Sequence, residues 1–127
     1  MESRAYKTVP VKIPPQDKMT AEIYFGDEKT KEVYLNLQNS TTEDRKLFEW
    51  LKRAFEDIKT EPNCGIQIPK RLWPKEYIQK YGITNLWKYD LPNAWRLIYS
   101  IGKEKVIVIA IILEWFDHKE YERRFNY

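Results

Sequence analysis

Apolar side chains recur at helical spacing in one long segment, "STTEDRKLFEWLKRAFEDIKTEPNCG". Ser40 or Thr41 can cap a helix here, with an acidic side chain three residues later completing a capping box. Pro62 stops it. The apolar positions form one stripe, with charged side chains on the opposite face: Leu47, Trp50, Leu51, Ala54, Phe55 and Ile58. The pattern predicts a long amphipathic helix.

The segments before this helix are less regular. Residues 1–20 contain Pro10, Pro14 and Pro15, which predict an extended arm preceding a domain of residues 21–127. "AEIYF" predicts a short strand. "GDEKTKEVYLNLQ" fits either period, because its apolar residues alternate and also share one helical face; we favour a helix.

Three strands are predicted in the second half of the chain. Residues 86–91 and 95–101 alternate, and "VIVIAIIL" is apolar throughout, with "LPNA" and "GKEK" as the turns. A strand that is apolar at every position is buried on both faces. Before these strands "PKEYIQKYG" can make two helical turns, and after them "HKEYERRFNY" predicts a helical turn or a docked tail. The order of elements predicts an α+β fold, with helices first and an antiparallel meander after them.

Length and composition fit one domain, since the chain has 127 residues of which 43% are hydrophobic. No apolar stretch reaches the ~18 residues needed to cross a bilayer, and the first residues lack a secretory signal. One cysteine excludes an internal disulfide and fits a reducing compartment. We therefore expect a cytoplasmic protein without membrane contact.

Positive charge gathers in the second half of the chain. Residues 1–63 carry 11 Lys/Arg and 12 Asp/Glu, whereas residues 64–127 carry 11 and 7. The second half also holds most of the tryptophans and the one histidine. A basic, aromatic half can bind nucleic acid or an acidic protein.

Arg96 and Lys88 lie on adjacent predicted strands. Alternation in "AWRLIYSI" places Arg96 among apolar neighbours, where it needs an anionic partner: a carboxylate such as Asp90 or Glu114, or a phosphate. Lys88 can share that face across an antiparallel pair. Each also has an ordinary interpretation, a structural salt bridge for Arg96 and a solvent-facing strand position for Lys88.

His118 and Tyr121 follow the apolar strand at a spacing that puts both on one side of a helix, beside Lys119 and Arg123. Histidine is the natural acid or base near neutral pH, and a position at the end of a buried strand is held rigidly. A capping or surface role is the alternative.

Metal and cofactor chemistry finds little support in the residues. One histidine and one cysteine cannot assemble a Cys/His zinc site, and the glycines form no phosphate-binding loop. Cys64 has no obvious activating base, so we expect an inert thiol. We expect neither a metal nor a cofactor.

The order of elements, with "WRLIYSI", "KVIVIAIILEWF" and "DHKEYERRF", resembles the RelE/ParE superfamily of type II toxins over roughly residues 21–125. Its members are small basic proteins with two N-terminal helices packed on a twisted antiparallel β-sheet, here followed by a short C-terminal helix or tail. The ending "DHKEYERRF" is similar to the HigB-like and YoeB-like branches.

The resemblance implies a toxin that cleaves messenger RNA on the ribosome, by attack of a ribose 2′-hydroxyl on the neighbouring phosphate. It also implies a cognate antitoxin that covers the basic site in a hetero-oligomer. Arg96 would stabilise the phosphate charge, His118 would be the acid or base, and Tyr121 would stack on a base or transfer a proton. The residues expected to contact RNA are Lys70, Arg71, Lys75, Lys88, Lys119, Arg123 and Arg124.

Two features depart from the family pattern. Asp90 stands two positions beyond the strand lysine, where members often carry a second basic residue; beside a phosphate it is repulsive unless it acts as a base or pairs with Arg96. The block of residues 66–85 is longer than usual. Its basic and aromatic side chains suit RNA contact, or form a buried aromatic loop with a basic rim.

Two other functions fit the same resemblance. One is a ParE-like toxin that poisons a topoisomerase by binding it. The other is a non-catalytic protein in which Asp90 neutralises Arg96. The pairing of His118 with Tyr121 favours the nuclease, because a pure binder needs no titrating group there.

Overall fold

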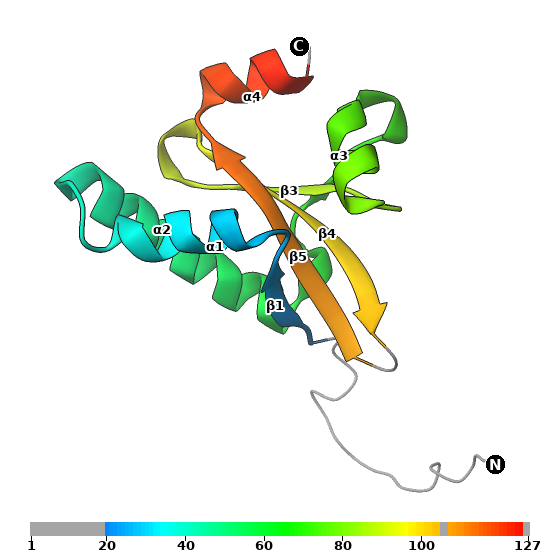
Figure 1. Ribbon diagram of the computed structural model, residues 1–127, viewed down its shortest axis with the longest axis horizontal. Coiled ribbons are helices and arrows are strands. Elements are labelled where there is room, and N and C mark those ends of the chain that lie inside the picture. Colours follow the sequence, from blue (N-terminus) through cyan, green and yellow to red (C-terminus); the bar gives the residue numbers. More distant parts are fainter. Residues whose placement is uncertain (1–19, 105–106, 126–127) are drawn as a thin grey trace, which may run out of the picture.

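The computed structural model describes residues 20–104 and 107–125. Five strands form one sheet in the order β1-β5-β4-β3-β2 (Figure 1). The strands are β1 (Glu22–Phe25), β2 (Ile66–Gln67), β3 (Trp87–Asp90), β4 (Arg96–Glu104) and β5 (Ile107–Phe116). The helices are α1 (Glu28–Leu37), α2 (Thr42–Thr60), α3 (Lys75–Tyr81) and α4 (His118–Phe125), with short turns η3 (Pro62–Cys64), η4 (Lys70–Leu72) and η5 (Pro92–Ala94). In the described ranges no helix is both long and apolar enough to cross a membrane.

The α+β class is confirmed, but the sheet is mixed and not antiparallel throughout. β2, β3, β4 and β5 pair antiparallel, whereas β1 runs parallel to β5 with Glu22 opposite Ile109. This pairing joins strands from the two ends of the fold, which no turn connects, so local patterns could not predict it. The turn expected at "GKEK" is also displaced, because residues 102–104 continue β4. Apart from Thr20, the predicted arm lies outside the described residues.

The two helices predicted before the sheet both form. Thr41 caps α2 by accepting a hydrogen bond at Oγ1 from the Asp44 N–H at 3.1 Å. Asp27 caps α1 in the same way, accepting from the Thr30 N–H at 2.8 Å. The ambiguous segment is therefore helical, as favoured from its period. An aromatic stack at 4.8 Å between Tyr34 and Phe48 joins the two helices.

Two cores lie on opposite faces of the sheet. α1 and α2 share one core with side chains such as Leu97 and Tyr99, while α3 and α4 share the other with Ile98 and Leu113. Figure 1 shows α3 and α4 on the opposite side of β3 from α1 and α2. The expectation that the main helices precede the sheet is thus wrong in part: α3 and α4 come later in the chain. β5 lies between the two layers, as its apolar sequence predicted, but only Ala110, Ile112, Leu113 and Phe116 are buried, and Ile107 at its start is 45% exposed.

A β-bulge in β5 changes which way its last residues face. Ile98 lies opposite Glu114 and Tyr99 lies opposite Ile112, so Leu113 is the extra residue. Leu113 packs in the α3/α4 core, and Glu114 accepts a hydrogen bond from Tyr77 of α3. Consecutive residues therefore face α3 and α4, against the alternation of a regular strand.

Gly65 fixes the position of β3 at its centre. Its N–H donates to the Tyr99 hydroxyl at 3.1 Å, and that hydroxyl donates to the Pro62 carbonyl at 2.6 Å. A Cβ on Gly65 would lie 2.5 Å from the Lys88 carbonyl oxygen. Only glycine allows this approach, and it sets the backbone from which Lys88 projects.

Candidate functional site

Two rows of side chains, polar and apolar, cross β3, β4 and β5 on the α3/α4 face of the sheet. The register gives the rows as Lys88–Ile98–Glu114 and Asp90–Arg96–Phe116. Lys88 and Arg96 therefore share a face, as strand alternation predicted, and lie diagonal to each other on neighbouring strands.

Tyr121 of α4 lies against both cations. Lys88 Nζ is 5.2 Å from the centre of the Tyr121 ring, and Arg96 Cζ is 5.3 Å from it. The ring is 1% exposed and packs 4.8 Å from the Phe125 ring, centroid to centroid. Because aromatic faces attract cations, one buried ring holds two like charges close together at the end of the sheet.

Arg96 has a carboxylate partner, one of the two alternatives left open by the sequence. Its Nε lies 3.1 Å from Asp90 Oδ1, and the two residues are directly opposite in the β3–β4 register. Nε is buried, and no hydrogen bond of good geometry reaches it from the described residues. Nη1 donates to the Trp95 carbonyl at 3.3 Å. Asp90 thus offsets the charge of Arg96 without satisfying its hydrogen bonds.

His118 stands apart from this pair in its described contacts. Its Nε2 lies 3.1 Å from Glu122 Oε2, one turn along α4, and the two side chains are 51% and 48% exposed. The imidazole is therefore open to solvent at the start of α4. Of the three predicted catalytic residues, the structure brings Arg96 and Tyr121 into contact and leaves His118 on the outer side of the same helix.

The basic residues of α4 differ in how far their charges are available to bind an anionic ligand. Lys119 is exposed and makes no ion pair among the described residues. Arg123 lies 2.5 Å from Glu120 on the exposed surface. Arg124 lies 2.5 Å from Glu114 with its side chain 23% exposed, so its charge is directed into the protein and not toward solvent.

Glu114, whose side chain is 34% exposed, joins α3 to α4. Its Oε1 accepts hydrogen bonds from the hydroxyl of Tyr77 and from Arg124 Nη1. Burial, reinforced by Glu114, raises the pKa of Tyr77 far above its ordinary value. Burial alone would lower the pKa of Arg124, but the charges of Glu114 and Glu76 raise it. The sequence offered Glu114 only as a partner for Arg96; the bulge gives it to these other two groups instead.

The basic residues of the 66–85 block form an exposed rim. Lys70 and Arg71 lie on η4 and Lys75 begins α3, and all three are exposed without an ion-pair partner in the described part of the chain. Trp73 is half-buried and donates from Nε1 to the Ile68 carbonyl at 2.8 Å. The block thus combines a half-buried, anchored tryptophan with an exposed basic rim, so it has features of both expected forms, and the rim is open to a polyanion.

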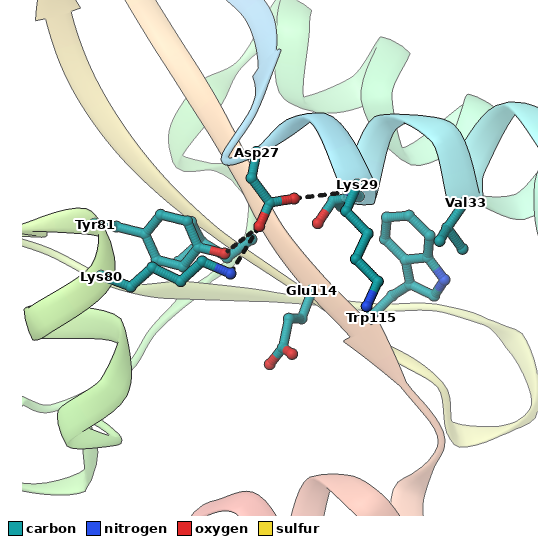
Figure 2. Close-up of a pocket in the computed structure, with 9 residues that line it drawn as sticks. Asp27, Lys29, Val33, Lys80, Tyr81, Glu114 and Trp115 are labelled. Atoms are coloured by element: carbon teal, nitrogen blue, oxygen red, sulfur yellow. Dashed lines mark hydrogen bonds and ion pairs between the residues drawn. The ribbon is translucent and has the colours of Figure 1, made fainter.

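A cavity of about 300 Å³ lies between α1, α3 and β5, which sequence reasoning missed. Figure 2 shows Lys80 and Tyr81 converging on Asp27, with Glu114 and Trp115 projecting from β5. Lys80 Nζ is 2.7 Å from Asp27 Oδ2. Hydrogen bonds from Lys80 and Thr30 hold the pKa of Asp27 well below its ordinary range. The charged side chains that line the cavity are largely paired, and no sequence pattern links the three segments that form the cavity.

Metal and thiol chemistry gain no support from the described residues. Within them no three His, Cys, Asp or Glu side chains gather as a metal site would require. Burial, with Asp57 and Glu61 nearby, raises the pKa of the Cys64 thiol, the direction of an unreactive cysteine.

Comparison with known proteins adds no relative, since no family model, no curated protein and no solved structure matches the chain.

Proposed function

We propose that this chain is a RelE-like toxin whose α3/α4 face binds messenger RNA on the ribosome and cleaves it. The observation that supports this best is the placement of Lys88 Nζ and Arg96 Cζ at 5.2 and 5.3 Å from one Tyr121 ring. Two cations held together against one carboxylate leave a positive site at the end of the sheet. A phosphodiester is the anion that RNA supplies to such a site.

The reaction follows from what such a site offers. A ribose 2′-hydroxyl attacks the neighbouring phosphorus, the bond from phosphorus to the 5′-oxygen breaks, and the products are a 2′,3′-cyclic phosphate and a 5′-hydroxyl. Arg96 and Lys88 hold the added negative charge of the phosphorane. His118 is assigned one of the two proton transfers because its imidazole is exposed at the start of α4; to act at Arg96 it must leave Glu122, which lies 3.1 Å away, and turn toward the phosphate.

Tyr121 takes a different part from the one its family position implies. With 1% of its surface exposed, it supports Lys88 and Arg96 from below and does not stack on a base. RNA flanking the scissile bond extends over basic side chains that face solvent: Lys70, Arg71, Lys75, Lys119 and Arg123. Arg124 contributes by holding α4 in place through Glu114. An antitoxin that covers this basic face would neutralise the toxin in a hetero-oligomer.

Induced expression followed by primer extension on a reporter message tests the proposal. We expect cuts at codon-related positions, reduced about 10²–10⁴-fold by His118→Ala and about 10²–10³-fold by Arg96→Ala. Lys46→Ala is the matched control, because Lys46 is an exposed cation on α2, at the other face of the sheet. An intact message on induction of the wild type would refute the nuclease, and cuts that persist in both site variants would refute this assignment of its site.

A second candidate is a non-catalytic binding protein of the same fold. It is favoured by the two ion pairs that engage the site: Asp90 with Arg96 at 3.1 Å, and Glu122 with His118 at 3.1 Å. It predicts an intact message and no growth arrest on induction. Growth arrest with an intact message and filamentation would instead indicate a topoisomerase poison.

A further inference from the structure

We infer that Asp90 is a built-in competitor of the RNA phosphate: its carboxylate occupies the anion position beside Arg96 until a phosphate displaces it. The inference rests on the proposed function and concerns the regulation of the same site. Asp90 projects from β3 directly opposite Arg96 on β4, so the register holds the carboxylate beside the guanidinium.

The contact between the two residues is electrostatic and incomplete. Asp90 Oδ1 lies 3.1 Å from Nε of Arg96, and that nitrogen makes no hydrogen bond of good geometry among the described residues. A guanidinium offers five N–H donors in a fixed fork that matches carboxylate and phosphate oxygens in pairs. Asp90 therefore neutralises Arg96 and leaves donors available for a better-placed anion.

The exposures of the two side chains show which partner can move. Arg96 is 17% exposed and held beneath by Tyr121, whereas Asp90 is 55% exposed. A phosphate that reaches Arg96 competes with the Asp90 carboxylate, because both anions bind the same cation. Asp90 must then turn toward solvent, which its exposure permits.

Displacement of Asp90 costs every anion that binds Arg96 the same ion pair. A small anion gains one contact with Arg96 and loses the Asp90 ion pair, so its net gain is small. A nucleic acid strand also contacts Lys88 and the basic rim of Lys70 and Arg71, and these contacts offset the lost ion pair. Asp90 thus sets a threshold for binding that a polyanion exceeds through its further contacts.

Binding of a fluorescent single-stranded RNA to the full chain, measured by anisotropy over a range of salt concentrations, tests the inference. We expect Asp90→Asn to tighten binding about three- to tenfold, the scale for one exposed charge beside a phosphate. The plot of log affinity against log salt should be steeper for Asp90→Asn than for the wild type, because salt screens the repulsion that the substitution removes. Glu104→Gln removes the same charge from the far end of β4 and is the control.

The double variant Asp90→Asn with Arg96→Ala locates the effect. The inference requires that the gain vanish in the Arg96→Ala background, and that the inhibition constant of inorganic phosphate fall in Asp90→Asn by a factor similar to the gain for RNA. Unchanged or weaker binding by Asp90→Asn, or a gain that survives the loss of Arg96, overturns the inference while leaving the nuclease intact. RNA binding that is independent of Arg96 in every variant overturns both.

Discussion

The hydroxyl groups of Tyr77 and Tyr89 provide a matched test of how burial sets the strength of the contacts that hold the site. Each donates a hydrogen bond to a carboxylate: Tyr77 to Glu114 across α3 and β5, and Tyr89 to Asp57 across β3 and α2. The Tyr77 side chain is 2% exposed, whereas the Tyr89–Asp57 bond lies at the surface. Burial raises the pKa of Tyr89 to about 12 and raises that of Tyr77 further.

The magnitudes follow from that difference in environment. A desolvated hydrogen bond to a charged group contributes about 1.5–3 kcal/mol, whereas an exposed one contributes at most about 1 kcal/mol. For a domain of this size, about 1 kcal/mol corresponds to a shift of about 4 °C in Tm. Tyr77→Phe should therefore lower Tm by about 6–12 °C, and Tyr89→Phe by less than about 4 °C.

Urea and thermal unfolding of both variants, followed by circular dichroism, provide the measurement. Each substitution removes one oxygen and keeps the ring, so packing is unchanged and the two free energies can be compared directly. Equal losses in the two variants, or a larger loss in Tyr89→Phe, would refute the view that the buried Tyr77–Glu114 contact holds α3 against the sheet.

Two further predictions concern Ala94 and Asp27. Ala94 in η5 has φ of 62°, a left-handed conformation that is unfavourable for any residue with a Cβ, so Ala94→Gly should raise the free energy of unfolding by about 0.5–1 kcal/mol. Asn93→Gly, at φ of 58°, should raise the free energy of unfolding by less, because asparagine tolerates this conformation. A loss of stability in Ala94→Gly would contradict the argument. Asp27 has a folded-state pKa below its ordinary 3.8, so its carboxylate stabilises the fold above that value and the contribution disappears as pH falls through the lower folded-state pKa. Asp27→Asn should therefore cost about 0.5–1 kcal/mol near neutral pH, discounted for exposure. Urea unfolding of both proteins across acid pH should give curves that begin to approach each other below pH about 4 and meet only as pH falls through the folded-state pKa. A constant offset at all pH values would show that the capping contacts of Asp27 do not depend on its charge.

Part of the candidate site could be read from neighbouring residues. Lys88 and Arg96 lie on strands joined by a short turn, so alternation and antiparallel pairing placed them on one face. Tyr121 was predicted as a site residue from its spacing after the apolar strand. Its burial against the sheet could not be predicted, because helical periodicity does not say which side of a short helix packs on the sheet. For the same reason, the sequence could not predict that His118 faces outward.

The contacts of Glu114 and Arg124 had no signal in the sequence. Regular alternation along β5 would have turned Glu114 toward α1 and α2, and the extra residue Leu113 reverses that. Once reversed, Glu114 meets Tyr77 from a helix far earlier in the chain and Arg124 from α4. A bulge depends on how two paired strands pack against both cores, so the sequence of one strand cannot predict it.

By itself the sequence determined the parts of this protein whose causes are local. The apolar stripe and the Thr41 cap define α2, alternation and turn residues define β3 and β4, and the continuous apolar run defines a central β5, because each is fixed by residues within a few turns of one another. Only the tertiary structure decided the parallel pairing of β1 with β5, the covering of the second face by α3 and α4, and the choice of Asp90 as the partner of Arg96. Those outcomes depend on competition among distant groups for the same face and the same charge, which is settled only when the chain is packed.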